Sequence, residues 1–230
     1  MTPADLMTIA AASVPTLCVD TCSLLDIMRD PTRDDARPHE RKAAIDLAAA
    51  MEAGELACLV AEQVKFEFQG HDAPIQAEAQ DAIRRLIERV DRANAVHGVF
   101  ATPKAVDLRH LGAQTAPARA VVERWLRAAR LVPGSDAVNV CAISRVNHNV
   151  SPARQGKDSV KDCIVFETYL AAVGELRALG MASTVVLLSS NTREYLSESR
   201  VLKPDLAPDL STLGIGYAPN LAAAKAALGF

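Results

Sequence analysis

The sequence predicts an α/β fold, a three-layer α/β/α arrangement with a mainly parallel central sheet of four to five strands. Short aliphatic runs alternate with longer segments whose apolar residues recur at helical spacing, and strands that alternate with helices build parallel sheets. Half of the 230 residues are apolar and only 4% are aromatic, which suits an aliphatic core packed against alanine-rich helices. No repeat and no linker divides the chain, so we expect one domain over residues 1–230.

The first third of the chain predicts two strands and three helices. Pro3 suits the first turn of a helix, Asp20 or Thr21 can cap the next helix, and Gly54 suits the end of a third. The predicted elements are a helix over 3–12, a strand over 16–20, a helix from 21 to about 29, a polar turn-rich loop over 30–38, a helix over 39–53 and a strand over 56–61.

The middle of the chain is predicted to be helical. Ile83, Leu86, Ile87 and Val90 recur at the spacing of one helix face. The segment Gly70–Pro74 is expected to interrupt this helical region, because proline breaks helix interiors. The predicted elements are a helical region over 66–96 with that interruption, an irregular stretch over 98–116, and helices over 117–131 and 136–146.

The last third contains TVVLLSSN, the clearest strand pattern in the chain, at 184–191. A long helix with a cap at Asp158 or Ser159 leads to Gly180 before it. The elements predicted after this strand are a short helix over 192–198, a strand over 213–217 and a closing helix over 219–228.

Charge and cysteine content limit the function classes. The net charge of −3 excludes the globally basic type of nucleic-acid binder, so any nucleic-acid contact needs a local basic patch. An odd number of cysteines and an N-terminal segment without a basic start predict a protein of the reducing cytoplasm. No apolar run approaches the length of a membrane span.

Acidic and polar side chains follow the predicted strands at their carboxyl ends, where open α/β sheets bind ligands. They are Asp20 after the first strand, Glu62 and Glu67 after the second, Ser189, Asn191 and Glu194 after the TVVLL strand, and Asp158 and Asp162 at the start of the helix before it. Converging carboxylates repel one another and are costly to bury, and a divalent cation removes that cost. Oxygen ligands without histidine or cysteine favour Mg²⁺ or Mn²⁺ over zinc.

Each of these residues also has a purely structural interpretation. Asp20 and Asp158 are typical helix caps, and Asp162 suits the first turn of a helix. Asn191 is a common turn residue, and Glu62 and Glu67 fit solvated positions. Their convergence at one sheet edge is therefore the observation that predicts a site.

Four segments together resemble the PIN-domain family of metal-dependent ribonucleases. They are LCVDTCSLLD, VAEQVKFEF, KDSVKDCIVFETYL and VVLLSSNTREY, and the tail LGIGYAPNLAAA is similar to the last strand and helix of that family. The chain is longer than the small toxins of the family. Its extra helices, at roughly 70–146, are expected to form a cap or a partner surface.

The resemblance implies an endoribonuclease that hydrolyses RNA phosphodiester bonds with Mg²⁺ or Mn²⁺. It assigns the catalytic residues Asp20, Glu67, Asp162, Ser189 and Asn191, with Glu62 as the alternative to Glu67. It assigns the metal to Asp20, Asp162, Glu67 and Glu194, and Ser189 would orient a carboxylate or a metal-bound water. A narrower version is the toxin of a toxin–antitoxin pair, with an antitoxin protein as partner; a homodimer is also open.

The departure from the family pattern is Asn191, which stands where many members have an acid. It supports an alternative, a catalytically weakened PIN-like scaffold that binds RNA or a protein partner. A phosphohydrolase with Asp20 as nucleophile is less favoured, because such enzymes want a second acid two residues on, where Cys22 stands.

Acids repel RNA, so basic residues must bind its phosphates. The basic loop over 144–159 supplies Arg145, His148, Arg154 and Lys157, and Arg193 is a further candidate. An ordinary solvated loop is the other interpretation of this segment.

Overall fold

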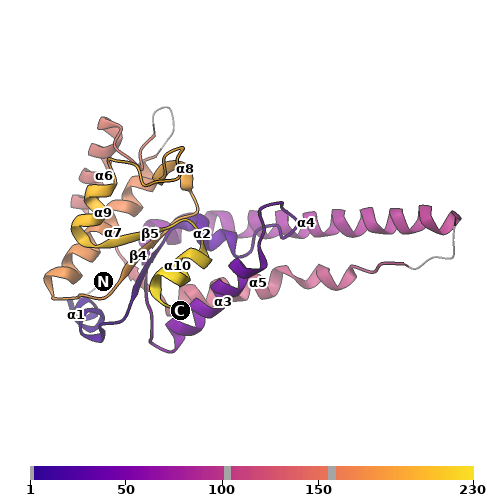
Figure 1. Ribbon diagram of the computed structural model, residues 1–230, viewed down its shortest axis with the longest axis horizontal. Coiled ribbons are helices and arrows are strands. Elements are labelled where there is room, and N and C mark those ends of the chain that lie inside the picture. The colour runs from indigo at the N-terminus through magenta and orange to yellow at the C-terminus, as the bar shows by residue number, and fades with distance from the viewer. Residues whose placement is uncertain (1–2, 101–104, 155–158) are drawn as a thin grey trace.

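Five parallel strands form one sheet, in a computed structural model that describes residues 3–100, 105–154 and 159–230. The strands lie in the order β3-β2-β1-β4-β5. Their bounds are β1 Thr16–Val19, β2 Ala57–Ala61, β3 Arg130–Val132, β4 Val185–Leu188 and β5 Ile215–Ala218. The sheet confirms the predicted α/β class, with helices on both of its faces (Figure 1).

The central strands β1 and β4 are buried along their whole length. Strands that are covered on both faces consist of continuous aliphatic runs, which is why the sequence showed them clearly. β3 was not predicted, because the sequence pattern continued the preceding helix through residue 131. This strand has three residues at the sheet edge, and Arg130 and Leu131 are exposed, so it lacks an apolar run.

Two helical layers cover the sheet. On one face lie α3 (Pro38–Glu52) and α10 (Leu221–Leu228), and on the other lie α7 (Val160–Ala178) and the start of α4 (Glu62–Phe100). The remaining helices are α1 (Pro3–Ala12) and α6 (Asp136–His148) against α7, α9 (Ala207–Leu213) beside β5, α2 (Thr21–Asp26), α5 (Thr115–Ala128), α8 (Thr192–Tyr195) and the 3-10 turn η1 (Arg109–Ala113).

The helix α4 is continuous from Glu62 to Phe100, so the predicted interruption near Gly70–Pro74 is wrong. A proline in a helix interior deprives the carbonyl four residues earlier of its hydrogen bond. Here that carbonyl belongs to Gly70, and both Gly70 and Pro74 are exposed to solvent. Water can therefore satisfy the carbonyl, and the helix continues through the proline.

Beyond the sheet, α4 and the returning chain form an arm, which we define as residues 84–100 and 105–116 (Figure 1). Val106 and Asn94 exchange two hydrogen bonds, of 2.9 and 3.2 Å, and Arg109 lies 3.5 Å from Asp91. The stretch 98–116 was expected to be irregular, whereas α4, η1 and α5 all extend into it. The region 70–146 is also not purely helical, because it contributes β3 to the sheet.

The start of α7 differs from the predicted cap. Ser159 takes the N-cap position without a side-chain capping bond, and its hydroxyl accepts from the Arg154 backbone N–H at 3.2 Å instead. Asp158, the other predicted cap, lies outside the described residues. Among the helices that the structure describes, none combines the length and apolar character needed to cross a bilayer.

Candidate functional site

Asp20 and Ser189 emerge side by side at the carboxyl edge of the sheet. Val19 pairs with Leu188 in the β1–β4 register, and each site residue is the next one along its strand. The strand order reverses direction between β1 and β4, and this topological switch point is where open parallel sheets bind ligands. The topology therefore places Asp20 at the position where a ligand is expected.

The carboxylate of Asp20 is buried and held by three donors. It accepts from Ser189 Oγ at 2.6 Å, from the Thr21 backbone N–H at 2.6 Å and from Cys22 Sγ at 3.1 Å. Burial is the main influence on its pKa and raises it, while the three hydrogen bonds lower it in part and Glu67 raises it further. Among the described residues no cationic side chain pairs with Asp20. A buried carboxylate of this kind is stabilised by a proton or by a bound cation.

Glu67 is the glutamate that the fold brings to Asp20. It accepts from Thr21 Oγ1 at 2.7 Å and from Gln63 Nε2 at 3.1 Å. Glu62 accepts from the Gly134 backbone N–H at 3.1 Å and so lies toward the end of β3. Asp20 itself takes the N-cap position of α2, and the Thr21 hydroxyl is used to position Glu67.

Asp162 and Glu194 lie further along the same edge. Burial raises the pKa of Tyr195 well above its ordinary value, and the charges of Asp20 and Asp162 add to this, so both carboxylates act on one buried phenol. Burial likewise raises the pKa of Cys163 to about 11, with smaller contributions from Asp162 and Glu194. Asp162 therefore influences one buried group together with Asp20 and another together with Glu194.

Asn191 and Glu194 are bound to each other on the far side of the site. The Asn191 side-chain amide donates to Glu194, whose side chain is only 1% exposed. The Asn191 backbone N–H also donates to Ser189 Oγ at 3.3 Å. The Ser189 hydroxyl therefore accepts from Asn191 and donates to Asp20.

Two tyrosines that the sequence pattern did not indicate hold the strand ends around the candidate site. The Tyr169 hydroxyl donates to the Val19 carbonyl at 2.5 Å and accepts from the Ala61 N–H at 3.0 Å, which joins α7 to the ends of β1 and β2. The Tyr217 hydroxyl donates to the Ser189 carbonyl at 2.7 Å. The usable signal is their position, because both are aromatic residues with polar tips inside otherwise apolar segments.

The basic residues of the predicted loop over 144–159 have different environments in the structure. Arg145 is only 11% exposed, pairs with Glu167 and Asp209, and lies 4.7 Å from the Phe166 ring centroid. It is therefore used inside the protein and does not belong to an exposed phosphate-binding surface. His148 bonds back to the Ser144 carbonyl at 2.8 Å, Arg154 and Arg193 are exposed, and Lys157 lies outside the described residues.

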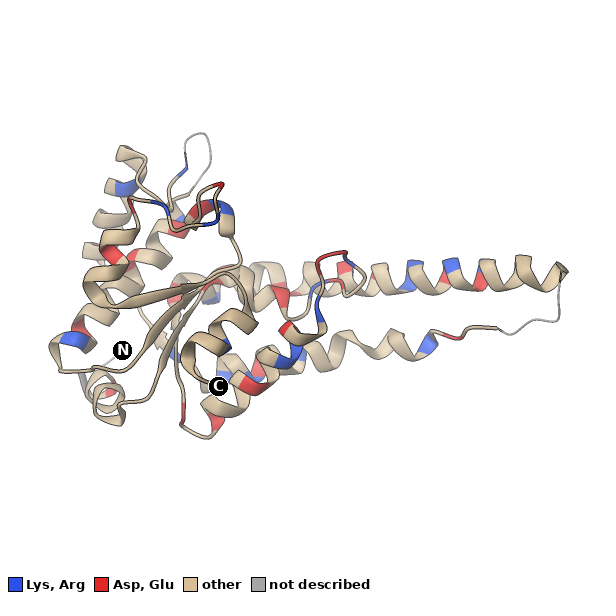
Figure 2. Cartoon of the chain, in the orientation of Figure 1, with Lys and Arg blue, Asp and Glu red and all other residues tan. Residues whose placement is uncertain are grey.

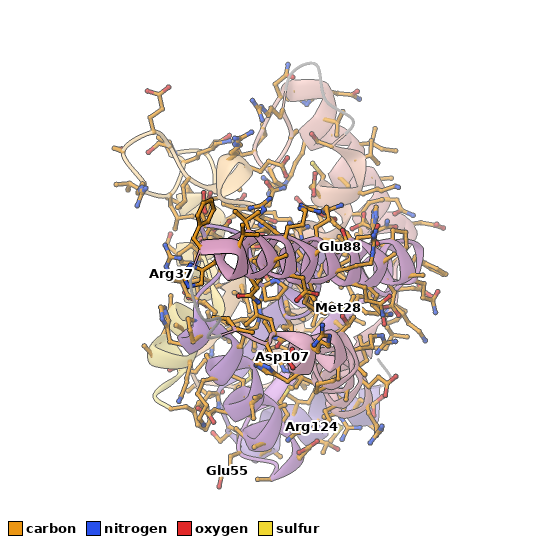
Figure 3. All side chains as sticks on the ribbon, turned by 90° about the vertical axis from the view of Figure 1, so that its right-hand side faces the viewer. Met28, Arg37, Glu55, Glu88, Asp107 and Arg124 are labelled. Atoms are coloured by element: carbon orange, nitrogen blue, oxygen red, sulfur yellow. The ribbon has the colours of Figure 1, made fainter. Side chains whose placement is uncertain are left out.

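A cavity of about 520 Å³ opens beside the site and is lined by four arginines, of which two lie in the predicted polar loop over 30–38 and one in each of the predicted helices that flank it. Cys22, Ser190 and Asn191 form its inner wall, and its arginines are Arg29, Arg33, Arg37 and Arg41. Figure 3 labels Arg37, one of these four arginines. The signal was available, since these four arginines recur at every fourth position.

The cationic groups in this cavity are only partly compensated. Burial lowers the pKa of Arg41, and the charges of Asp26 and Glu40 oppose this effect. The Arg41 guanidinium donates to the Arg29 carbonyl at 3.5 Å. Arg29 Nε is buried without a hydrogen bond, 3.3 Å from Asp26. Acids also line the cavity, so it offers positioned guanidinium groups rather than a general positive charge.

The donor set fits a divalent cation that is shared with a substrate, and not a cage built from protein alone. In the described part of the chain no group of three or more His, Cys, Asp or Glu side chains is placed to hold one ion. Mg²⁺ is commonly bound through one or two carboxylates, with water and substrate phosphates completing its shell. Asp20, with Glu67 joined to it through Thr21, supplies oxygen ligands of that kind.

A scan against protein-family models, a search of curated proteins and a search of solved structures each found no match to this chain.

Proposed function

We propose that this protein is a metal-dependent endoribonuclease of the PIN type, with its site at the carboxyl edge of β1 and β4. The observation that carries the proposal is the Asp20 carboxylate. It is buried at the switch point of the sheet, hydrogen-bonded by Ser189 and without a cationic partner among the described residues. A bound cation would favour the charged form of this carboxylate and would offset its repulsion of an anionic substrate.

Four side chains and one backbone amide of the protein would orient the carboxylates or add negative charge. Ser189 and the Thr21 amide fix the direction of the Asp20 carboxylate, and Thr21 with Gln63 fixes Glu67. Asp162 adds negative charge from the first turn of α7. A bound Mg²⁺ or Mn²⁺ would lower the pKa of an attacking water and offset the charge on the leaving oxygen.

The arginine-lined cavity supports a phosphate-bearing substrate. Its wall includes Cys22, which contacts Asp20, so a phosphate held by Arg41 would lie next to the carboxylate site. Guanidinium groups are the side chains best suited to phosphate oxygens. This cavity takes the place of the 144–159 loop as the main candidate for substrate binding.

Cleavage of total RNA tests the proposal. The purified protein is expected to cut RNA in Mg²⁺ or Mn²⁺ and to stop in EDTA, and Asp20→Asn is expected to lose cleavage while keeping its circular dichroism spectrum. Glu55→Gln is the control, because Glu55 is exposed and stands just before β2, at the opposite end of the parallel strands from Asp20. Cleavage by Asp20→Asn at the parental rate would contradict the site.

A non-catalytic scaffold that binds RNA or a protein partner is the second candidate. Two observations favour it: the Asn191 amide is already bound to Glu194, and the described residues hold no cluster of three or more metal-type ligands. Calorimetric titration separates the two candidates. A nuclease should bind Mn²⁺ with an affinity that Asp20→Asn reduces, whereas the scaffold should show no binding that depends on Asp20.

A narrower proposal is that the enzyme acts as the toxin of a toxin–antitoxin pair. Induced expression should then arrest growth, and Asp20→Asn should relieve the arrest.

A further inference from the structure

We infer that the arm carries an RNA-binding stripe, formed by Arg85, Arg89 and Arg92 of α4, which extends the nucleic-acid path away from the carboxyl-edge site. The inference rests on the proposed function for the identity of its ligand. The surface itself is defined by helix geometry and by charge pairing, and neither was used to propose the function.

The three arginines lie on one face of α4. Their spacing of four and three residues aligns side chains along a helix and spans about 10 Å of its axis. The opposite face, with Ile83, Ile87 and Val90 at its centre, turns toward the returning chain through Asn94. The stripe therefore faces outward, and all three arginines are exposed.

The stripe shares its helix face with the site. Glu67 and Arg85 are separated by about five full turns of an ideal helix, so their side chains leave α4 in the same direction. Glu67 uses that direction to reach Thr21 beside Asp20. Because α4 is continuous between these residues, one rigid element presents a site carboxylate at one end and three arginines at the other (Figure 1).

Charge pairing distinguishes the stripe from the other arginines of the arm. Arg84 pairs with Asp81 and Glu88, and Arg109 pairs with Asp91 and Asp107. Among the described residues, Arg85, Arg89 and Arg92 form no ion pair or side-chain hydrogen bond. Figure 2 shows the Lys and Arg positions along this part of α4, and Figure 3 labels Glu88 and Asp107 on the two segments of the arm.

Such an arrangement has a physical cost without a ligand. Like charges four residues apart destabilise a helix. The carboxylates that are spaced to offset them are Asp81, four residues before Arg85, and Glu88, four residues before Arg92, and both pair with Arg84 instead. Glu78 is an acid on the same face, but it lies nearer the site than the stripe does. A linear row of guanidinium groups matches the linear charge of a phosphate backbone, so we assign the stripe to an RNA strand.

The reach of the arm predicts a dependence on RNA length. At 1.5 Å per residue, the stripe begins about 27 Å and ends about 38 Å from Glu67 along α4. A strand that rises about 3.4 Å per nucleotide needs roughly 8 to 11 nucleotides to cover that distance. Shorter RNAs bound at the site should not contact the arginines.

Fluorescence anisotropy with labelled oligouridylates of about 6, 12 and 24 nucleotides tests this inference. All proteins carry Asp20→Asn, so that RNA stays intact. The test variant is Arg85→Gln/Arg92→Gln. The control is Arg84→Gln/Arg109→Gln, which removes the same charge from other faces of the same arm. Circular dichroism checks that both remain helical.

For the two longer RNAs, the test variant should raise the Kd roughly tenfold near 0.1 M salt and lower the salt slope by about 1.4. It should leave the binding of the shortest RNA unchanged, and the control should change the Kd by less than about twofold at every length. The assignment of the stripe would be overturned if the two variants raised the Kd equally. It would also be overturned if the test variant raised the Kd for the shortest RNA as much as for the longer ones. If RNA binding depends on the stripe but the parent protein does not cleave RNA, the proposed nuclease activity is refuted. The assignment of the stripe to RNA binding is supported in that case.

Discussion

Ser189 donates its hydroxyl to Asp20 at 2.6 Å across the β1–β4 junction, and both side chains are buried. The two residues are 169 positions apart in the sequence, yet the register of two parallel strands places them next to each other. A hydroxyl that fixes the direction of a buried carboxylate is typical of the second layer around a metal site.

Ser189→Ala should therefore weaken metal binding and RNA cleavage. The loss of an outer partner of a metal ligand commonly costs about 10- to 100-fold in metal affinity or activity. Mn²⁺ titration and cleavage assays measure both quantities. Ser183→Ala is the control, because the Ser183 hydroxyl has no hydrogen-bond partner among the described residues. Equal activities of the two variants would exclude a positioning role for Ser189.

The stability of the protein should fall as the pH rises above the ordinary pKa of Asp20, near 3.8. Burial raises the pKa of Asp20 in the folded state, so the folded protein binds a proton that the unfolded chain releases. The free energy of unfolding then decreases between 3.8 and the raised pKa, and is level above it. Urea denaturation over this range should show a slope that Asp20→Asn lacks.

At neutral pH, Mg²⁺ should restore part of that stability in the parent protein, because a ligand that binds only the folded state stabilises it. The unfolding midpoint of Asp20→Asn should not respond to Mg²⁺. An equal response of both proteins would place the cation elsewhere.

Tyr169→Phe should destabilise the protein by about 1–3 kcal/mol. The change removes one hydroxyl that serves both the Val19 carbonyl and the Ala61 N–H, and leaves two buried backbone groups without a partner. Urea denaturation measures the loss. Tyr217→Phe is a useful comparison, since its hydroxyl serves a single carbonyl, that of Ser189, and should cost less.

Arg145→Met should destabilise the protein by about 3–5 kcal/mol, because it leaves the partly buried Glu167 and Asp209 without their cation. Arg154→Met, at an exposed position, should stay within about 0.5 kcal/mol of the parent. Where the Arg145 variant remains folded, its salt dependence of RNA binding should match the parent. A reduced salt slope would instead show that Arg145 contacts phosphate.

Gly70→Ala should stabilise the protein by about 0.5–1 kcal/mol, because glycine inside a helix costs about that much relative to alanine. Among the described residues, a Cβ at this position meets no atom within 4 Å outside the helix's own backbone. Gly54→Ala is the matched control and should destabilise, since Gly54 has a φ of +74°. A loss of stability in Gly70→Ala would show that α4 bends at this point in solution.

The sequence by itself determined the class of fold and the sheet edge at which Asp20 and Ser189 meet. β1 and β4 are covered on both faces, so their aliphatic runs were visible without any knowledge of their neighbours. Asp20 and Ser189 follow those runs directly, and parallel strands carry such residues to the same edge. These features depend on local order along the chain.

Only the tertiary structure decided what each polar side chain does. The Thr21 hydroxyl donates to Glu67, which is 46 positions away in the sequence. Arg145 donates to Glu167 and to Asp209, which are 22 and 64 positions away in the sequence. The continuity of α4 through Pro74 and the edge strand β3 were likewise hidden, because local propensity opposes both. The physical reason is common to all of them: the partner that satisfies a charge or a backbone group comes from a distant part of the chain, and local spacing carries no information about it.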